Sequence, residues 1–181
     1  MTRWIIFTVV VACGTVPALA HTPFSTEFRK RFIQAPDGAL VKFYGSVENS
    51  KKFTSWAKST PKMGGCKICH GTKKTERNSF GQAISDRLRR NLADPDKGIA
   101  AFRDVQESEQ NKWIKDSVKR SSPDYEATLS AFKKSLDKVL DLPSERDRDN
   151  RPVPDAQTFA DRIRAGLHPA PEVEKVRKKK K

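Results

Sequence analysis

The sequence predicts a single small domain that is mostly α-helical. Apolar residues recur three or four positions apart in several segments, as they do on one face of an amphipathic helix. Clusters of Pro, Gly and Asp separate these segments. Only 36% of the 181 residues are hydrophobic, and the mean hydropathy is -0.71. A core built from side chains alone is therefore small, and a buried cofactor would add the apolar surface that is missing.

Residues 1–20 have the layout of a secretory signal peptide. A basic start, "MTR", precedes the 10 residues "WIIFTVVVAC", and "TVPALA" then ends in small residues at Ala18 and Ala20. The apolar run is too short to cross a bilayer, which takes about 20 residues. We expect export to the periplasm, with cleavage before His21. The alternative is a lipid anchor on Cys13, because "VVAC" loosely resembles a lipobox.

The first part of the domain combines one helical pattern with an ambiguous segment. Phe24, Phe28 and Phe32 lie four residues apart and predict a short helix that Ser25 begins. "APDG" follows as a turn. Residues 39–47, "ALVKFYGSV", predict a short strand or an extended segment. After it, "SWAKST" predicts a helical segment that Pro61 stops.

The middle of the chain predicts the longest helices. Ser79 and Gln82 have the spacing of a capping box, with Ser79 as N-cap. "ADPDKG" then breaks that helix, and residues 99–119 have a weaker pattern that fits two helices. Ser122 as N-cap and Pro123 at the first position predict the clearest helix. The apolar stripes of the two long helices are Phe80, Ile84, Leu88 and Leu92, and then Tyr125, Leu129, Phe132, Leu136, Val139 and Leu140.

The C-terminal part predicts a linker, one more helix and a tail. Residues 141–154 are charged and contain Pro. A last helix near 155–165 turns Phe159 and Ile163 inward and stops at Gly166. The domain is expected to span 21–169. A disordered basic tail, 170–181, follows it.

"GGCKICHG" contains the chemistry of the chain, Cys66, Cys69 and His70. A disulfide between the two cysteines would close a very short loop and constrain little of the unfolded chain. A thioredoxin-like redox pair belongs after a buried strand, which "SWAKSTPKMGG" does not resemble. A zinc site would need His168 or His21 as its fourth ligand, and a His directly after the second Cys is not a usual zinc spacing.

Covalent haem attachment explains all three residues together. Each cysteine sulfur bonds one vinyl group of the macrocycle, and His70 lies under the iron as its proximal ligand. Here the sequence resembles the c-type cytochromes, which implies one covalent haem c. "RNSFGQAI" at 77–84 and "TFADRIRAGLHP" at 158–169 are also similar to segments of small exported monohaem proteins. The resemblance implies a cytochrome-like helical domain with extra helices.

The second axial ligand of the iron stays open among several candidates. Electron-transfer cytochromes of the common type use a Met there, and Met63 lies only three residues before Cys66. His168 follows the last expected helix and is the first candidate. His21 at the mature N-terminus is another. The last option is a vacant position or a weak ligand such as Lys, and a vacant position would let small gases or peroxide bind.

The chain is strongly basic, with 36 Lys and Arg against 22 Asp and Glu and a formal net charge of +14. The charge predicts docking to an acidic redox partner or to an anionic membrane surface. No nucleic-acid recognition motif accompanies it. The expected function is single-electron transfer by an electron carrier rather than an enzyme. The alternatives are a five-coordinate haem enzyme or sensor, and a zinc or thiol-redox protein without haem.

Overall fold

The computed structural model describes residues 22–33, 39–58, 66–70, 77–145, 153 and 156–172. The expected signal peptide, Cys13, His21 and Met63 lie outside these residues, as does most of the predicted tail. The described helices are α1 (Thr22–Phe32), α2 (Ala39–Tyr44), α3 (Val47–Lys58), α4 (Cys66–Cys69), α5 (Ser79–Ala93), α6 (Ala100–Arg103), the 3-10 turn η1 (Glu107–Glu109), α7 (Gln110–Ser117), α8 (Tyr125–Leu140) and α9 (Phe159–Arg164).

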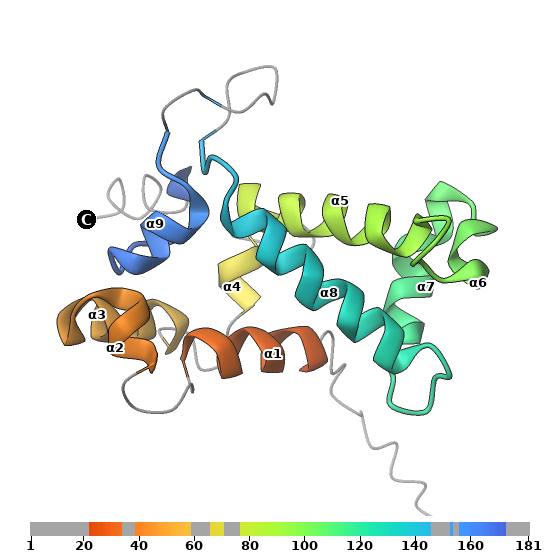
Figure 1. Cartoon of the computed structure of the whole chain (residues 1–181), viewed down its shortest axis with the longest axis horizontal. Helices are drawn as coiled ribbons and strands as arrows, with labels where there is room; N and C mark the ends of the chain where they lie inside the picture. The colour runs from red at the N-terminus through yellow and green to blue at the C-terminus, as the bar shows by residue number, and fades with distance from the viewer. Residues whose placement is uncertain are drawn as a thin grey trace, which may run out of the picture.

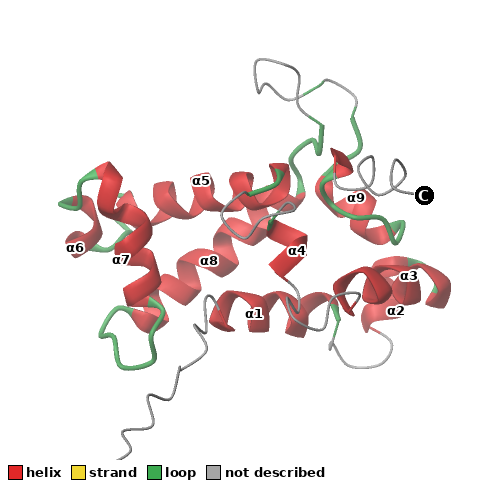
Figure 2. Ribbon diagram, turned by 180° about the vertical axis from the view of Figure 1, so that it is seen from behind, coloured by secondary structure: helices red, strands yellow, loops and turns green. Residues whose placement is uncertain are grey.

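The prediction of a mostly α-helical fold is confirmed. Within the described residues, β-type pairing is limited to two isolated bridges, His70 with Arg77 and Pro143 with Thr158. None of the described helices is both long enough and apolar enough to cross a membrane. The two long helices α5 and α8 lie side by side and form the centre of the fold. The single-turn helix α4 lies between this pair and α1 in both ribbon views (Figures 1 and 2).

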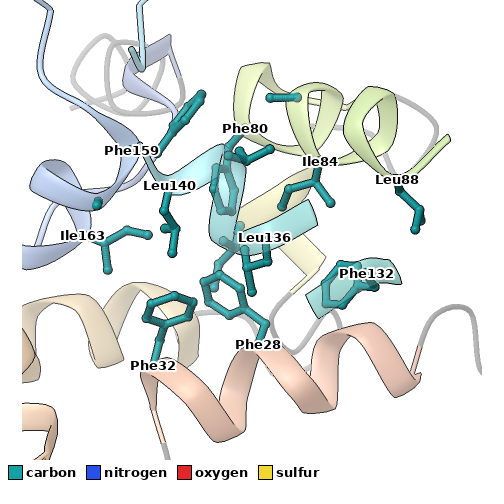
Figure 3. Packing of buried hydrophobic residues seen from close by; sticks show 14 of the residues in the cluster. Phe28, Phe32, Phe80, Ile84, Leu88, Phe132, Leu136, Leu140, Phe159 and Ile163 are labelled. Atoms are coloured by element: carbon teal, nitrogen blue, oxygen red, sulfur yellow. The ribbon is translucent and has the colours of Figure 1, made fainter. Parts of the chain in front are cut away.

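Aromatic rings from distant parts of the sequence meet in one core. The centroid of the Phe80 ring on α5 lies 6.1 Å from that of Phe28 on α1 and 5.1 Å from that of Phe159 on α9. Leu136 of α8 is 2% exposed and points into the same cluster (Figure 3). The expected stripes of α5 and α8 are buried, except that Tyr125 is only half-buried. The spacing of apolar residues therefore identified the inward faces of both long helices.

The prediction of a strand or extended segment at 39–47 is wrong. Residues 39–44 form α2, and Gly45 ends it in the left-handed region at φ 68°. The Tyr44 hydroxyl donates to the Phe32 carbonyl at 2.8 Å, and burial raises the pKa of that phenol. A run this short and apolar has no period that separates strand from helix, so its tertiary contacts decide.

Three predicted helix starts are shifted along the chain. α1 already begins at Thr22, so Ser25 lies inside it. α5 has Asn78, not Ser79, as its N-cap. The Ser122 hydroxyl instead accepts from the Asp124 N–H at 3.3 Å in a turn that precedes α8. Ser, Asn and Asp favour caps and turns alike, so neighbouring residues of these types compete for the same role.

The C-terminal helix has the predicted inward residues, and the chain stays packed beyond it for longer than expected. Phe159 and Ile163 are fully buried, and Gly166 ends the helix with φ 73°. The boundary of the tail at residue 170 is wrong, because Ala170 is also fully buried. Glu172 accepts hydrogen bonds from the N–H of Ser79 at 2.7 Å and from its hydroxyl at 3.1 Å. The packed chain thus reaches the start of α5.

Candidate functional site

The "CKIC" stretch forms the single turn α4, and His70 follows it directly. Positions 66 and 69 are three residues apart, a spacing that puts two positions on one side of a helix. The side chain of Cys66 lies outside the described parts of the structure, whereas Cys69 and His70 are both half-buried. His70 also forms the antiparallel bridge with Arg77, which begins the run toward α5.

Asn78 ties the turn containing the cysteines to the start of α5. Its amide nitrogen donates to the Ile68 carbonyl at 2.9 Å and to the His70 carbonyl at 3.2 Å. Its amide oxygen accepts from the Gly81 N–H at 2.9 Å, which is the N-cap bond of α5. The Asn78 backbone N–H donates to the Cys69 carbonyl at 3.2 Å. One buried side chain therefore caps the helix and holds both ends of the Ile68–His70 segment.

Gly81 allows the two helices to touch. A Cβ at this position would overlap the Cys69 carbonyl oxygen and lie 2.7 Å from the Cys69 carbonyl carbon. These are backbone atoms, so no side chain can rotate to make room. The Asn and Gly of "RNSFG" thus have a direct physical role, which is to hold α4 against the first turn of α5.

A cavity opens beside Cys69 and His70. Its wall is mainly apolar and comes from Phe24 and Phe28 of α1, Ile84 and Leu88 of α5, Ile114 of α7 and Phe132 of α8. Figure 3 shows Ile84 and Leu88 pointing from α5 into the space between that helix and α1, where Phe28 and Phe132 also lie.

The polar part of the lining comes from Ser25, Arg77, Ser85 and Asn111, besides Cys69 and His70. The sequence did not assign any of these four residues to a ligand site. Ser25 was predicted only as a helix start, and Arg77 only belonged to the "RNSFGQAI" segment. Ser85 and Asn111 were not singled out. Their place at the cavity follows only from the way α7 packs beside α5.

His168 does not lie at this cavity. It follows α9, is 2% exposed, and its Nδ1 accepts from the Ala170 N–H at 3.0 Å. Its carbonyl accepts from Arg162 Nε at 2.9 Å. Among the described residues, no three His, Cys, Asp or Glu side chains gather where they would hold a metal ion. The structure therefore brings Cys69 and His70 together, but not His168.

The lining suits an apolar group that is attached at one side. Aromatic and aliphatic side chains form the wall, and a thiol and an imidazole stand together at one side of it. Gly81, where the α4 backbone approaches α5 closely, also lines this cavity. The apolar lining and this pair of side chains, the thiol and the imidazole, are the chemistry that a covalently attached haem requires.

The loss of the Asn78 side chain should weaken this part of the fold. We expect Asn78→Ala to lower the free energy of unfolding by about 2 to 3 kcal/mol, because the N-cap bond and the donor to two carbonyls both disappear. Asn78→Ser keeps an N-cap acceptor but has no amide donor, so it should recover only about 1 kcal/mol of that loss. Urea unfolding measures all three proteins. Equal stability of wild type and Asn78→Ala would contradict the role of this side chain.

Comparison with known proteins adds no relative. No protein-family model matches the chain, and no significant match is found among curated proteins or solved structures.

Proposed function

We propose that this chain binds one haem c in the cavity beside α4 and transfers single electrons. One observation supports the proposal most directly: the second Cys and the His of the CxxCH motif both border a mainly apolar cavity. The motif by itself is five residues long. Its position at such a cavity is what a covalent haem site requires, and a surface disulfide does not require it.

The residues of the chain would have separate tasks in this site. Cys66 and Cys69 would each form a thioether to the macrocycle, and His70 would give an imidazole nitrogen to the iron. The bound haem supplies an iron that cycles between two oxidation states. Phe28, Phe132 and their neighbours would exclude water, and burial of this kind is one determinant of a haem's reduction potential.

The setting of the protein is part of the same proposal. Residues 1–20 would direct the chain to the periplasm, where haem c is attached. Cleavage before His21 would remove Arg3, and the remaining 35 Lys and Arg against 22 Asp and Glu would give a net charge of +13. This charge would attract an acidic redox partner or an anionic membrane surface, and the encounter would slow as salt is added.

A visible absorption spectrum tests the haem directly. The protein is matured in a host that attaches haem c, purified, and recorded oxidised and then reduced. We expect a c-type spectrum whose colour stays with the polypeptide after extraction with acidified acetone. A colourless protein from a host that loads a control cytochrome would overturn the proposal and turn attention to zinc or thiol chemistry.

A second candidate function is the binding of small molecules at the iron. Of the described side chains that line the cavity, only Cys69 and His70 belong to the types that usually ligate haem iron. This observation favours a five-coordinate enzyme or sensor for peroxide or small gases. Titration of the reduced protein with carbon monoxide distinguishes this function from that of an electron carrier. Tight binding supports the open site, whereas no binding supports an electron carrier whose second ligand, such as Met63 or His21, comes from outside the described residues.

A further inference from the structure

The rim of the cavity contains two guanidinium groups that share one neutral acceptor. Arg89 donates to the Asn111 side-chain oxygen at 3.0 Å, and Arg77 donates to the same oxygen at 3.4 Å. Arg77 and Asn111 line the cavity, whereas Arg89 of α5 is not part of the lining and reaches it through its hydrogen bond to Asn111. Two like charges on one amide oxygen are an unfavourable arrangement unless an anion accompanies them.

The other groups around this pair offset its charge only in part. Desolvation by burial, followed by the charge of Arg89, lowers the pKa of Arg77, while Asp86 and Cys69 act in the opposite direction. Asp86 keeps its negative charge while it accepts from the neutral Gln82 amide at 2.7 Å, so one carboxylate faces two guanidinium groups.

At least one guanidinium N–H donor at this rim also has no acceptor among the described residues. Arg89 Nε is buried and has no hydrogen-bond partner among the described residues. Each guanidinium has five N–H donors in a planar fork, and this fork matches a carboxylate better than any other acceptor in proteins except phosphate. The α7 side of the rim adds the neutral Asn111, and the neighbouring Lys112 of that helix is exposed.

We infer that Arg77, Arg89 and Asn111 form a carboxylate-binding site at the polar rim of the cavity. The ligand has an apolar body, which the aromatic wall receives, and an acidic group, which the two guanidinium groups receive. The carboxylate has two sources. It belongs to the propionates of the haem, which rests on the proposed function, or to a small free acid that enters beside the bound group.

Infrared difference spectroscopy distinguishes these sources. The holoprotein is prepared with haem that carries ¹³C in its propionate carboxyl groups, and oxidised-minus-reduced spectra identify their bands. If the propionates occupy the site, those bands shift in Arg77→Gln and in Arg89→Gln. They stay unchanged in Arg90→Gln, a matched control that removes an exposed arginine from the same helix.

A titration with acetate against sodium chloride tests the free acid. If the site takes a free carboxylate, acetate binds the wild type, and its affinity falls about tenfold or more in either of the two rim variants but not in Arg90→Gln. Unshifted bands together with no specific acetate binding would overturn the inference. A protein without haem would overturn the proposed function alone, because the acetate titration still reports on the rim.

Discussion

Replacing Gly81 by alanine is expected to lower the free energy of unfolding by about 1 to 3 kcal/mol. This is the usual cost of forcing an extra carbon into a packed site. At most helix positions this change is favourable by about 0.5 to 1 kcal/mol. Here the new Cβ would overlap the Cys69 carbonyl oxygen, so α4 has to move away from α5. The sign of the effect therefore reports the close contact.

Under the proposed function, the same variant should also lower the haem content of the protein. Cys69 and His70 are held at the cavity by the contact with α5 and by the hydrogen bonds of Asn78. When that contact opens, we expect a smaller fraction of purified chains to carry haem. Urea unfolding and the ratio of haem absorbance to protein absorbance are the two measurements. Gln82→Ala, the next residue and an exposed one, is the control and should change both only slightly.

If the Gly81→Ala protein is as stable as the wild type and carries as much haem, α4 does not pack on α5 as described. Stability lost at normal haem content would mean that the packing is real but that attachment does not depend on it. The two measurements therefore distinguish the contact itself from its importance for the site.

Replacing both Cys66 and Cys69 by alanine is expected to abolish covalent haem attachment. Both thioethers would be lost, and the proposed function requires at least one of them. We expect the double variant to lose its colour on extraction with acidified acetone, and each single variant to keep a shifted c-type spectrum through the remaining bond. His70→Ala, in contrast, should keep attached haem and lose the low-spin or proximal-histidine signature.

Cys13→Ala is the matched control, since it removes the third cysteine of the chain and leaves the motif intact. Its spectrum should equal that of the wild type. If Cys13 is lipidated, this variant would also move the protein from the membrane fraction to the soluble one. Far-ultraviolet circular dichroism of the double variant checks that its helices remain. A double variant that keeps acid-resistant colour would rule out attachment through this motif.

The sequence alone determined the helical class and the inward faces of the long helices. Apolar residues four apart identify a buried face whatever it packs against, which is why the residues of the α5 and α8 stripes were predicted correctly. The motif Cys66–His70 was equally visible, because its chemistry depends on residues adjacent in the chain. The N-caps, Asn78 and Asp124, were missed by one and two residues, because neighbouring Ser, Asn and Asp residues compete for caps and turns.

Only the tertiary structure decided how the cavity is formed. Its wall joins α1, α5, α7 and α8, and no local pattern reports which helix faces meet. Arg77 and Asn111 are 34 positions apart and share a hydrogen bond, whereas His168, an attractive ligand by residue type, is buried in contacts of its own beyond α9. Side-chain chemistry can be read from single residues, but proximity arises from packing between distant segments. The sequence therefore named the cysteines and the histidine, and the fold selected their neighbours.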